Sequence, residues 1–130
     1  MYSQTSHNIR VTVLVDYLPN ESRPQEGLHA WSYQVEIENL QDYAVQLLRR
    51  HWTITDMNGI TKEVKGPGVV GQQPVIEAGE RFDYTSGTWL NTTSGMMFGT
   101  YTMLDIDGNE FDVTIPAFSL DVPGAKLRAN

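Results

Sequence analysis

The sequence has no cysteine, and this absence sets aside a whole group of functions. Disulfide crosslinks, thiolate nucleophiles, iron–sulfur clusters and cysteine-ligated zinc sites all need cysteine sulfur. The three histidines, His7, His29 and His51, lack the two- or four-residue spacing that brings two imidazoles to one metal ion. We therefore expect no tight metal site and no bound cofactor.

Basic residues are also scarce. Nine lysines and arginines stand against sixteen aspartates and glutamates, which gives a net charge of −7. Residues 66–125 contain one basic residue, Arg81, and eight acidic ones. Because nucleic-acid backbones and anionic membranes attract basic surfaces, we expect neither as a partner of this chain.

Long apolar runs are missing as well. No segment has the uninterrupted apolar length that a membrane-spanning helix needs. Residues 1–7 are polar and lack the charged start and the apolar stretch of a signal peptide. We therefore expect a cytoplasmic protein that has no part in a membrane.

What the chain does contain is alternation of apolar and polar residues, the pattern of half-buried strands. Seven segments are expected to form strands: 9–17, 31–38, 45–56, 60–64, 81–90, 95–106 and 110–115. Two of the connections, 57–59 and 107–109, contain the asparagine and glycine that tolerate positive φ in tight hairpin turns. Helical spacing does not persist over a helix-length window anywhere.

About seven short strands in a chain of 130 residues predict an all-β domain. The expected architecture is a two-sheet antiparallel β-sandwich of the immunoglobulin or fibronectin type III kind. We expect a single domain over residues 1–127, followed by a short tail at 128–130. The side chains expected in its core are Trp31, Val35, Leu48, Trp52, Ile54, Phe82, Tyr84 and Tyr101.

Gly66, Gly68 and Gly71 have the G-x-G-x-x-G spacing of loops that cradle a dinucleotide's pyrophosphate. Such a loop follows a strand and opens a helix, but residues 72–75 contain a proline and begin no helix. A purely structural loop is the first interpretation, in which each glycine adopts a conformation that a β-carbon resists. The second interpretation is contact with a nucleotide or pyrophosphate through backbone amides.

The acidic segment with Asp105, Asp107 and Glu110 partly resembles a calcium-binding loop. Aligning Gly108 with the sixth position of such a loop leaves no carboxylate at its first and twelfth positions. A hairpin turn with a solvated acidic rim is therefore the simpler interpretation.

Residues 49–52 alternate in character along a predicted strand. Arg49 and His51 lie on one side of it, with Arg50 and Trp52 on the other. These side chains can meet an acidic partner, and a solvated strand face explains them equally well. No G-x-S-x-G motif is present, and the hydroxyls of residues 84–87 have no histidine nearby in the sequence, so we expect no enzyme.

The most specific signals are short segments spread over nearly the whole chain. They are 11–15, 31–35 (WSYQV), 48–52 (LRRHW), 56–59 (DMNG), 66–71 (GPGVVG), 84–87 (YTSG) and 115–118 (IPAF). With these segments the sequence closely resembles the ApaG family of bacterial proteins. The resemblance implies a fibronectin type III-like sandwich, in agreement with the strand pattern.

The resemblance also implies a biological setting. The ApaG family is linked genetically to a diadenosine-tetraphosphate hydrolase, to cobalt resistance and to magnesium efflux, without an established biochemical activity. Related domains in eukaryotic F-box proteins and in a polymerase-delta-interacting protein imply a role in protein interaction. A pyrophosphate contact has been proposed for the family's glycine motif, which falls here on Gly66, Gly68 and Gly71.

Three functional hypotheses follow. The first is a non-catalytic interaction module with an unidentified protein partner. The second is a binder of a nucleotide or pyrophosphate at the glycine-rich loop, residues 66–71. The third is a direct role in handling divalent cations through the acidic downstream half.

Overall fold

The computed structural model of the chain describes residues 1–124, which form nine β-strands and one short 3₁₀ turn at Pro24–Glu26. The strands are β1 (Tyr2–Ser6), β2 (Ile9–Tyr17), β3 (His29–Asn39), β4 (Val45–Asp56), β5 (Thr61–Pro67), β6 (Val75–Ile76), β7 (Arg81–Leu90), β8 (Ser94–Leu104) and β9 (Glu110–Asp121). The predicted boundary between residues 127 and 128 lies outside the described residues. Within them no helix is long and apolar enough to cross a membrane.

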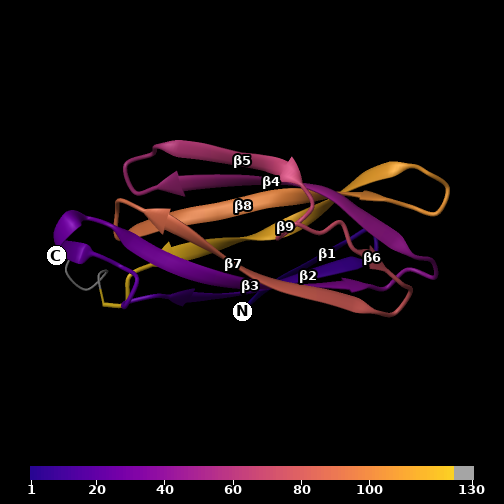
Figure 1. The fold of residues 1–130 in the computed structure, drawn as a ribbon, viewed down its shortest axis with the longest axis horizontal. Coiled ribbons are helices and arrows are strands. Elements are labelled where there is room, and N and C mark those ends of the chain that lie inside the picture. Colours follow the sequence, from indigo (N-terminus) through magenta and orange to yellow (C-terminus); the bar gives the residue numbers. More distant parts are fainter. Residues whose placement is uncertain (125–130) are drawn as a thin grey trace.

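The strands form two antiparallel sheets, so the predicted two-sheet β-sandwich is confirmed (Figure 1). One sheet has the order β1-β2-β3-β7 and the other the order β5-β4-β8-β9, with β6 paired to the start of β4. The sandwich is closed on one side, where β9 packs against β1 and β2. On the opposite side the edge strands are β5 and β7.

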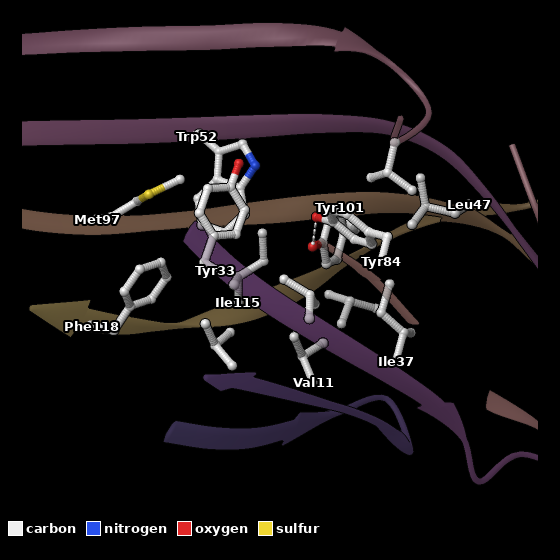
Figure 2. Close-up of a cluster of buried hydrophobic side chains, with 14 of the residues drawn as sticks. Val11, Tyr33, Ile37, Leu47, Trp52, Tyr84, Met97, Tyr101, Ile115 and Phe118 are labelled. Atoms are coloured by element: carbon white, nitrogen blue, oxygen red, sulfur yellow. Dashed lines mark hydrogen bonds between the residues drawn. The ribbon is translucent and has the colours of Figure 1, made fainter. Parts of the chain in front are cut away.

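The core lies between the sheets and is built by alternating positions of each strand. Six of the side chains predicted for it are buried as expected: Trp31, Val35, Trp52, Ile54, Tyr84 and Tyr101. Figure 2 shows several of these rings packed together with Phe118. Phe82 is only partly buried, because it packs against this cluster from the edge strand β7.

Two β-bulges explain where the sequence prediction of β4 and β9 failed. Leu48 is an extra residue of β4 opposite β8, and it shifts the alternation. Leu47 is therefore fully buried, whereas Leu48 is only partly buried, so the prediction of Leu48 as a core residue is wrong. A second bulge between Ile115 and Phe118 interrupts the alternation of β9. The strand continues past residue 115, where it was expected to end.

The sequence analysis also missed two strands. β1 is polar, and none of its residues is buried, so it lacks the alternation by which the other strands were found. It is held by antiparallel pairing with β2. β6 has only two residues, too few for any pattern.

Candidate functional site

The open side of the sandwich contains two adjoining pockets of about 240 and 390 Å³. Four residues line both of them: Tyr33, Arg50, Trp52 and Ser86. We call the two pockets together the inter-sheet cleft. The larger pocket is completed by the connection after β5, with Val70 and Gly71 among its lining residues.

Strand pairing places these side chains opposite one another. Tyr33 of β3 is the register partner of Ser86 on β7, so both lie on the inner face of the same sheet. Beyond the bulge at Leu48, Arg50 and Trp52 share the inner face of β4. The predicted separation of Arg50 and Trp52 from Arg49 and His51 is confirmed, since Arg49 and His51 line neither pocket of the cleft. Arg50 also reaches a third pocket, which Arg49 and His51 line.

Arg50 is held by main-chain oxygens and by a glycine. Its Nη1 donates hydrogen bonds to the carbonyl oxygens of Pro67, at 3.1 Å, and Gly68, at 2.9 Å. A β-carbon on Gly66 would lie 3.1 Å from both terminal nitrogens of the guanidinium, so Gly66 leaves the room that Arg50 occupies. The guanidinium pairs with no carboxylate of the described chain, and its charge is left uncompensated.

Trp52 is only 2% exposed, yet its indole N–H donates to no residue within 1–124. In this part of the chain, every side-chain nitrogen or oxygen that is inaccessible to solvent has a hydrogen-bond partner. The indole N–H must therefore reach the cleft that Trp52 lines. By contrast, the indole N–H of Trp31 donates to the carbonyl oxygen of Asp121 at 3.0 Å.

Tyr33 and Tyr84 line the cleft on the side of the core. The hydroxyls of Tyr84 and Tyr101 hydrogen-bond to each other inside the core, as Figure 2 shows. Burial raises the pKa of both Tyr84 and Tyr101 well above the ordinary value for tyrosine. Burial also raises the pKa of Tyr33, against the opposing effect of a hydrogen bond with Ser86. These hydroxyls stay protonated at neutral pH, so they serve as hydrogen-bonding groups and not as bases.

The three glycines of the predicted motif have three different roles. Gly66 has no positive φ and makes space for Arg50. Gly68, with φ 61°, donates its amide to the carbonyl oxygen of Leu48 at 2.8 Å. Gly71, with φ 80°, follows Val70, with φ 42°, in a tight turn. The expected backbone conformation that resists a β-carbon is therefore found at Gly68 and Gly71. At Gly66 a β-carbon is instead opposed by the guanidinium of Arg50.

Residues 69–72 fold back as a two-residue hairpin turn and do not open a helix. The amides of Val69 and Gln72 each donate to the other residue's carbonyl oxygen at 2.8 Å, and positive φ at both central positions defines a type I′ turn. The amides of Gly68, Val69 and Gln72 are thus engaged. At this turn of the described chain, only the amides of Val70 and Gly71 have no acceptor.

Alanine substitutions at two of these glycines are expected to differ in cost. A β-carbon on Gly68 would lie 2.0 Å from the carbonyl oxygen of Gln72, whereas one on Gly71 would meet nothing within 4 Å. Gly71→Ala should lower the free energy of unfolding by about 1 kcal/mol, from positive φ alone. Gly68→Ala should lower it by about 2–4 kcal/mol, because the loop backbone must also shift. Urea denaturation measures both values, and equal losses would contradict this geometry.

The acidic segment at 105–110 is a hairpin turn, as the simpler interpretation predicted. One carboxylate oxygen of Asp105 accepts the amides of Asp107 and Asn109, both at 2.9 Å, and Gly108 has φ 82°. Within residues 1–124, no group of three or more histidine, aspartate or glutamate side chains is placed to hold a metal ion.

Among residues 1–124, some of the lysines and arginines form an ion pair with a carboxylate, and others do not. Four arginines each pair with a glutamate: Arg10, Arg23, Arg49 and Arg81. Among the residues that the structure describes, Arg50, Lys62 and Lys65 are the basic side chains without an ion pair. All three lie on the neighbouring strands β4 and β5. Lys62 lines the smaller pocket of the cleft, and Lys65 lines a third pocket, of about 630 Å³, that also includes Arg50.

Comparison with known proteins gives consistent matches. Residues 19–105 match the model of the ApaG domain family. A protein named ApaG from Paramagnetospirillum magneticum is 56% identical over 130 residues, which cover both chains completely. The crystal structure of a putative ApaA protein from Bordetella pertussis has a TM-score of 0.86 and 41% identity, covering 89% of this chain and 94% of its own. An X-ray structure of a structural genomics target has a TM-score of 0.85 and 44% identity, covering 91% and 89%.

Proposed function

The chain belongs to the ApaG family, and we propose that it is a non-catalytic binding module that takes an acidic segment of a protein partner at the inter-sheet cleft. One observation carries this proposal. The unpaired basic side chains Arg50, Lys62 and Lys65 gather on one hairpin of a chain whose net charge is −7. Positive charge that forms no direct ion pair, beside aromatic walls, attracts and orients an acidic partner.

The chemistry of the cleft supports a role without catalysis. A hydroxyl nucleophile needs a base within hydrogen-bond reach, and histidine is the usual one. None of the three histidines lines either pocket of the cleft. Tyr33 and Tyr84, which line the cleft, have raised pKa values because they are buried, so they do not supply a base either.

We place nucleotide or pyrophosphate binding at residues 66–71 second. A pyrophosphate cradle uses several successive free amides, and those of Gly68, Val69 and Gln72 are already engaged. Direct handling of divalent cations comes third, because the carboxylate of Asp105 already accepts two backbone amides. A genetic link to cobalt and magnesium is compatible with action through a protein partner.

Charge reversal on β5 tests this function. We expect the double variant Lys62→Glu with Lys65→Glu to lose a protein that the immobilised wild type retains from a cell lysate. The matched control, Arg10→Glu with Arg23→Glu, makes the same change in net charge at exposed positions of β2 and the connection after it. It should retain the partner as the wild type does. Equal retention by all three proteins, or equal loss in both variants, would refute the proposed surface.

A further inference from the structure

Residues from two segments that line the larger pocket of the inter-sheet cleft have hydrogen-bond donors without an acceptor among residues 1–124. The indole N–H of Trp52 and the amides of Val70 and Gly71 have no acceptor in the described chain. Arg50 uses only Nη1 in its hydrogen bonds to carbonyl oxygens, so its Nη2 is also free. All four residues line the same space of about 390 Å³. Val70 is 54% exposed and the indole N–H of Trp52 reaches the cleft, so these donors face water and are available to an acceptor supplied by a ligand.

The charge of the pocket limits the kind of acceptor. Arg50 is its one charged lining residue, and the other donors are neutral. A carboxylate has one negative charge and two oxygens, and it matches a guanidinium with a few neutral donors. A pyrophosphate has at least two negative charges and would need a second cation inside the same pocket. The donor set therefore favours a carboxylate.

The positions of the two lysines indicate which carboxylate. Arg50 lines three pockets, and Lys62 and Lys65 lie in the two that adjoin the larger cleft pocket. Lys62 pairs with Ile54 in the β4–β5 register and faces the cleft, whereas Lys65 pairs with His51 and faces outward, near Glu63. Positive charge therefore runs from the cleft around the edge strand β5. A chain that runs past Arg50 with further acidic residues uses both lysines, whereas a chain that ends at Arg50 leaves one of them unused.

We propose that Arg50, the indole N–H of Trp52 and the amides of Val70 and Gly71 form a receptor for one side-chain carboxylate, from an aspartate or glutamate of the partner. This receptor rests on the proposed function, because it assigns the cleft to the partner's acidic segment. The aromatic walls from Tyr33 and Trp52 shield the contact from water and so strengthen it.

The test is a titration followed by the three indole N–H signals in ¹H–¹⁵N NMR spectra. The main probe is N-acetyl-glutamate amide, whose only charge is a side-chain carboxylate, and N-acetyl-glutamine amide is its neutral counterpart. N-acetylglycine and inorganic phosphate represent a chain end and a phosphate. Trp31, whose indole N–H already donates to the carbonyl oxygen of Asp121, serves as the internal reference. Trp89 lines the smaller pocket of the cleft and is not used as one.

The glutamate probe should shift the Trp52 signal downfield with saturation and leave the Trp31 signal in place. Arg50→Gln should weaken this binding at least about tenfold, the loss expected for a charged hydrogen bond. Its control, Arg49→Gln, removes the neighbouring arginine, which pairs with Glu110 outside the cleft, and should leave binding unchanged. If Arg50→Gln does not fold, the comparison of the four probes on the wild type decides alone.

Three results would overturn the receptor: no shift of Trp52, an equal shift with the glutamine probe, or tighter binding of N-acetylglycine or phosphate. Each of these leaves the proposed function standing if the reversal of Lys62 and Lys65 still abolishes capture of the partner. A saturable shift of Trp52 without a captured partner would instead retain the receptor and refute the proposed function.

Discussion

Replacing Trp52 by alanine is expected to lower the free energy of unfolding by about 3–5 kcal/mol. The side chain is 2% exposed, and its ring lies 5.3 Å from that of Tyr33 and 6.0 Å from that of Phe118, measured between centroids. Its removal opens a cavity at the point where the two sheets meet. Chemical denaturation monitored by circular dichroism gives the value.

Trp89→Ala is the matched control for this substitution. Trp89 is 43% exposed, so its loss should cost less than about 1 kcal/mol. A cost below about 1 kcal/mol for Trp52→Ala as well would place Trp52 outside the core and contradict the fold.

Stability is expected to fall steeply above pH 10. Burial raises the pKa of Tyr84 and Tyr101 in the folded chain, whereas the unfolded chain titrates near pH 10. Their contribution is therefore complete below pH 10 and is lost as the pH rises toward the folded-state pKa values. In that range each buried hydroxyl lowers the free energy of unfolding by about 1.4 kcal/mol per pH unit. The two together lower it by about 3 kcal/mol per pH unit.

Urea denaturation at intervals between pH 9 and pH 11.5, with tyrosinate absorbance recorded alongside, checks this expectation. The unfolding free energy should be level up to pH 10 and then decline, and Tyr84 and Tyr101 should ionise only as the chain unfolds. Tyr101→Phe removes one of the two buried hydroxyls, so it should reduce the slope of the decline by about 1.4 kcal/mol per pH unit. Ionisation of all six tyrosines near pH 10 in a chain that stays folded would contradict the buried hydroxyl pair.

Alternation predicted the strands wherever pairing is regular. β2, β4 and β7 have the predicted bounds, because period two is unbroken at their ends. The prediction failed at Leu48 and beyond Ile115, where a bulge adds one residue and shifts the inward face. A bulge depends on how the partner strand is aligned, and a single strand's sequence does not contain that information.

The glycine motif shows how spacing alone misleads about geometry. The expectation that no helix follows Gly71 is confirmed, since residues 69–72 form a hairpin turn. The different roles of the three glycines could not be predicted from the sequence. They depend on the guanidinium of Arg50, which lies over Gly66 from another strand, and on the carbonyl oxygen of Gln72 beside Gly68.

The inter-sheet cleft was only partly visible in the sequence. The common side of Arg50 and Trp52 followed from alternation, but Tyr33 and Ser86 reach them through the pairing of β3 with β7. The sequence analysis placed Trp52 in the core and left open whether residues 49–52 meet an acidic partner or form a solvated strand face. In the structure Trp52 is buried and still offers its N–H to the cleft, so one residue serves both packing and the candidate site.

The central claim is that the basic side chains of β4 and β5 without an ion pair bind an acidic partner. The most direct test is a calorimetric measurement of the affinity for the captured protein. The dissociation constant should rise at least about tenfold in the Lys62→Glu, Lys65→Glu variant, which corresponds to about 1.4 kcal/mol, and change less than about twofold in the Arg10→Glu, Arg23→Glu control. Equal dissociation constants for the wild type and the Lys62→Glu, Lys65→Glu variant would contradict the claim.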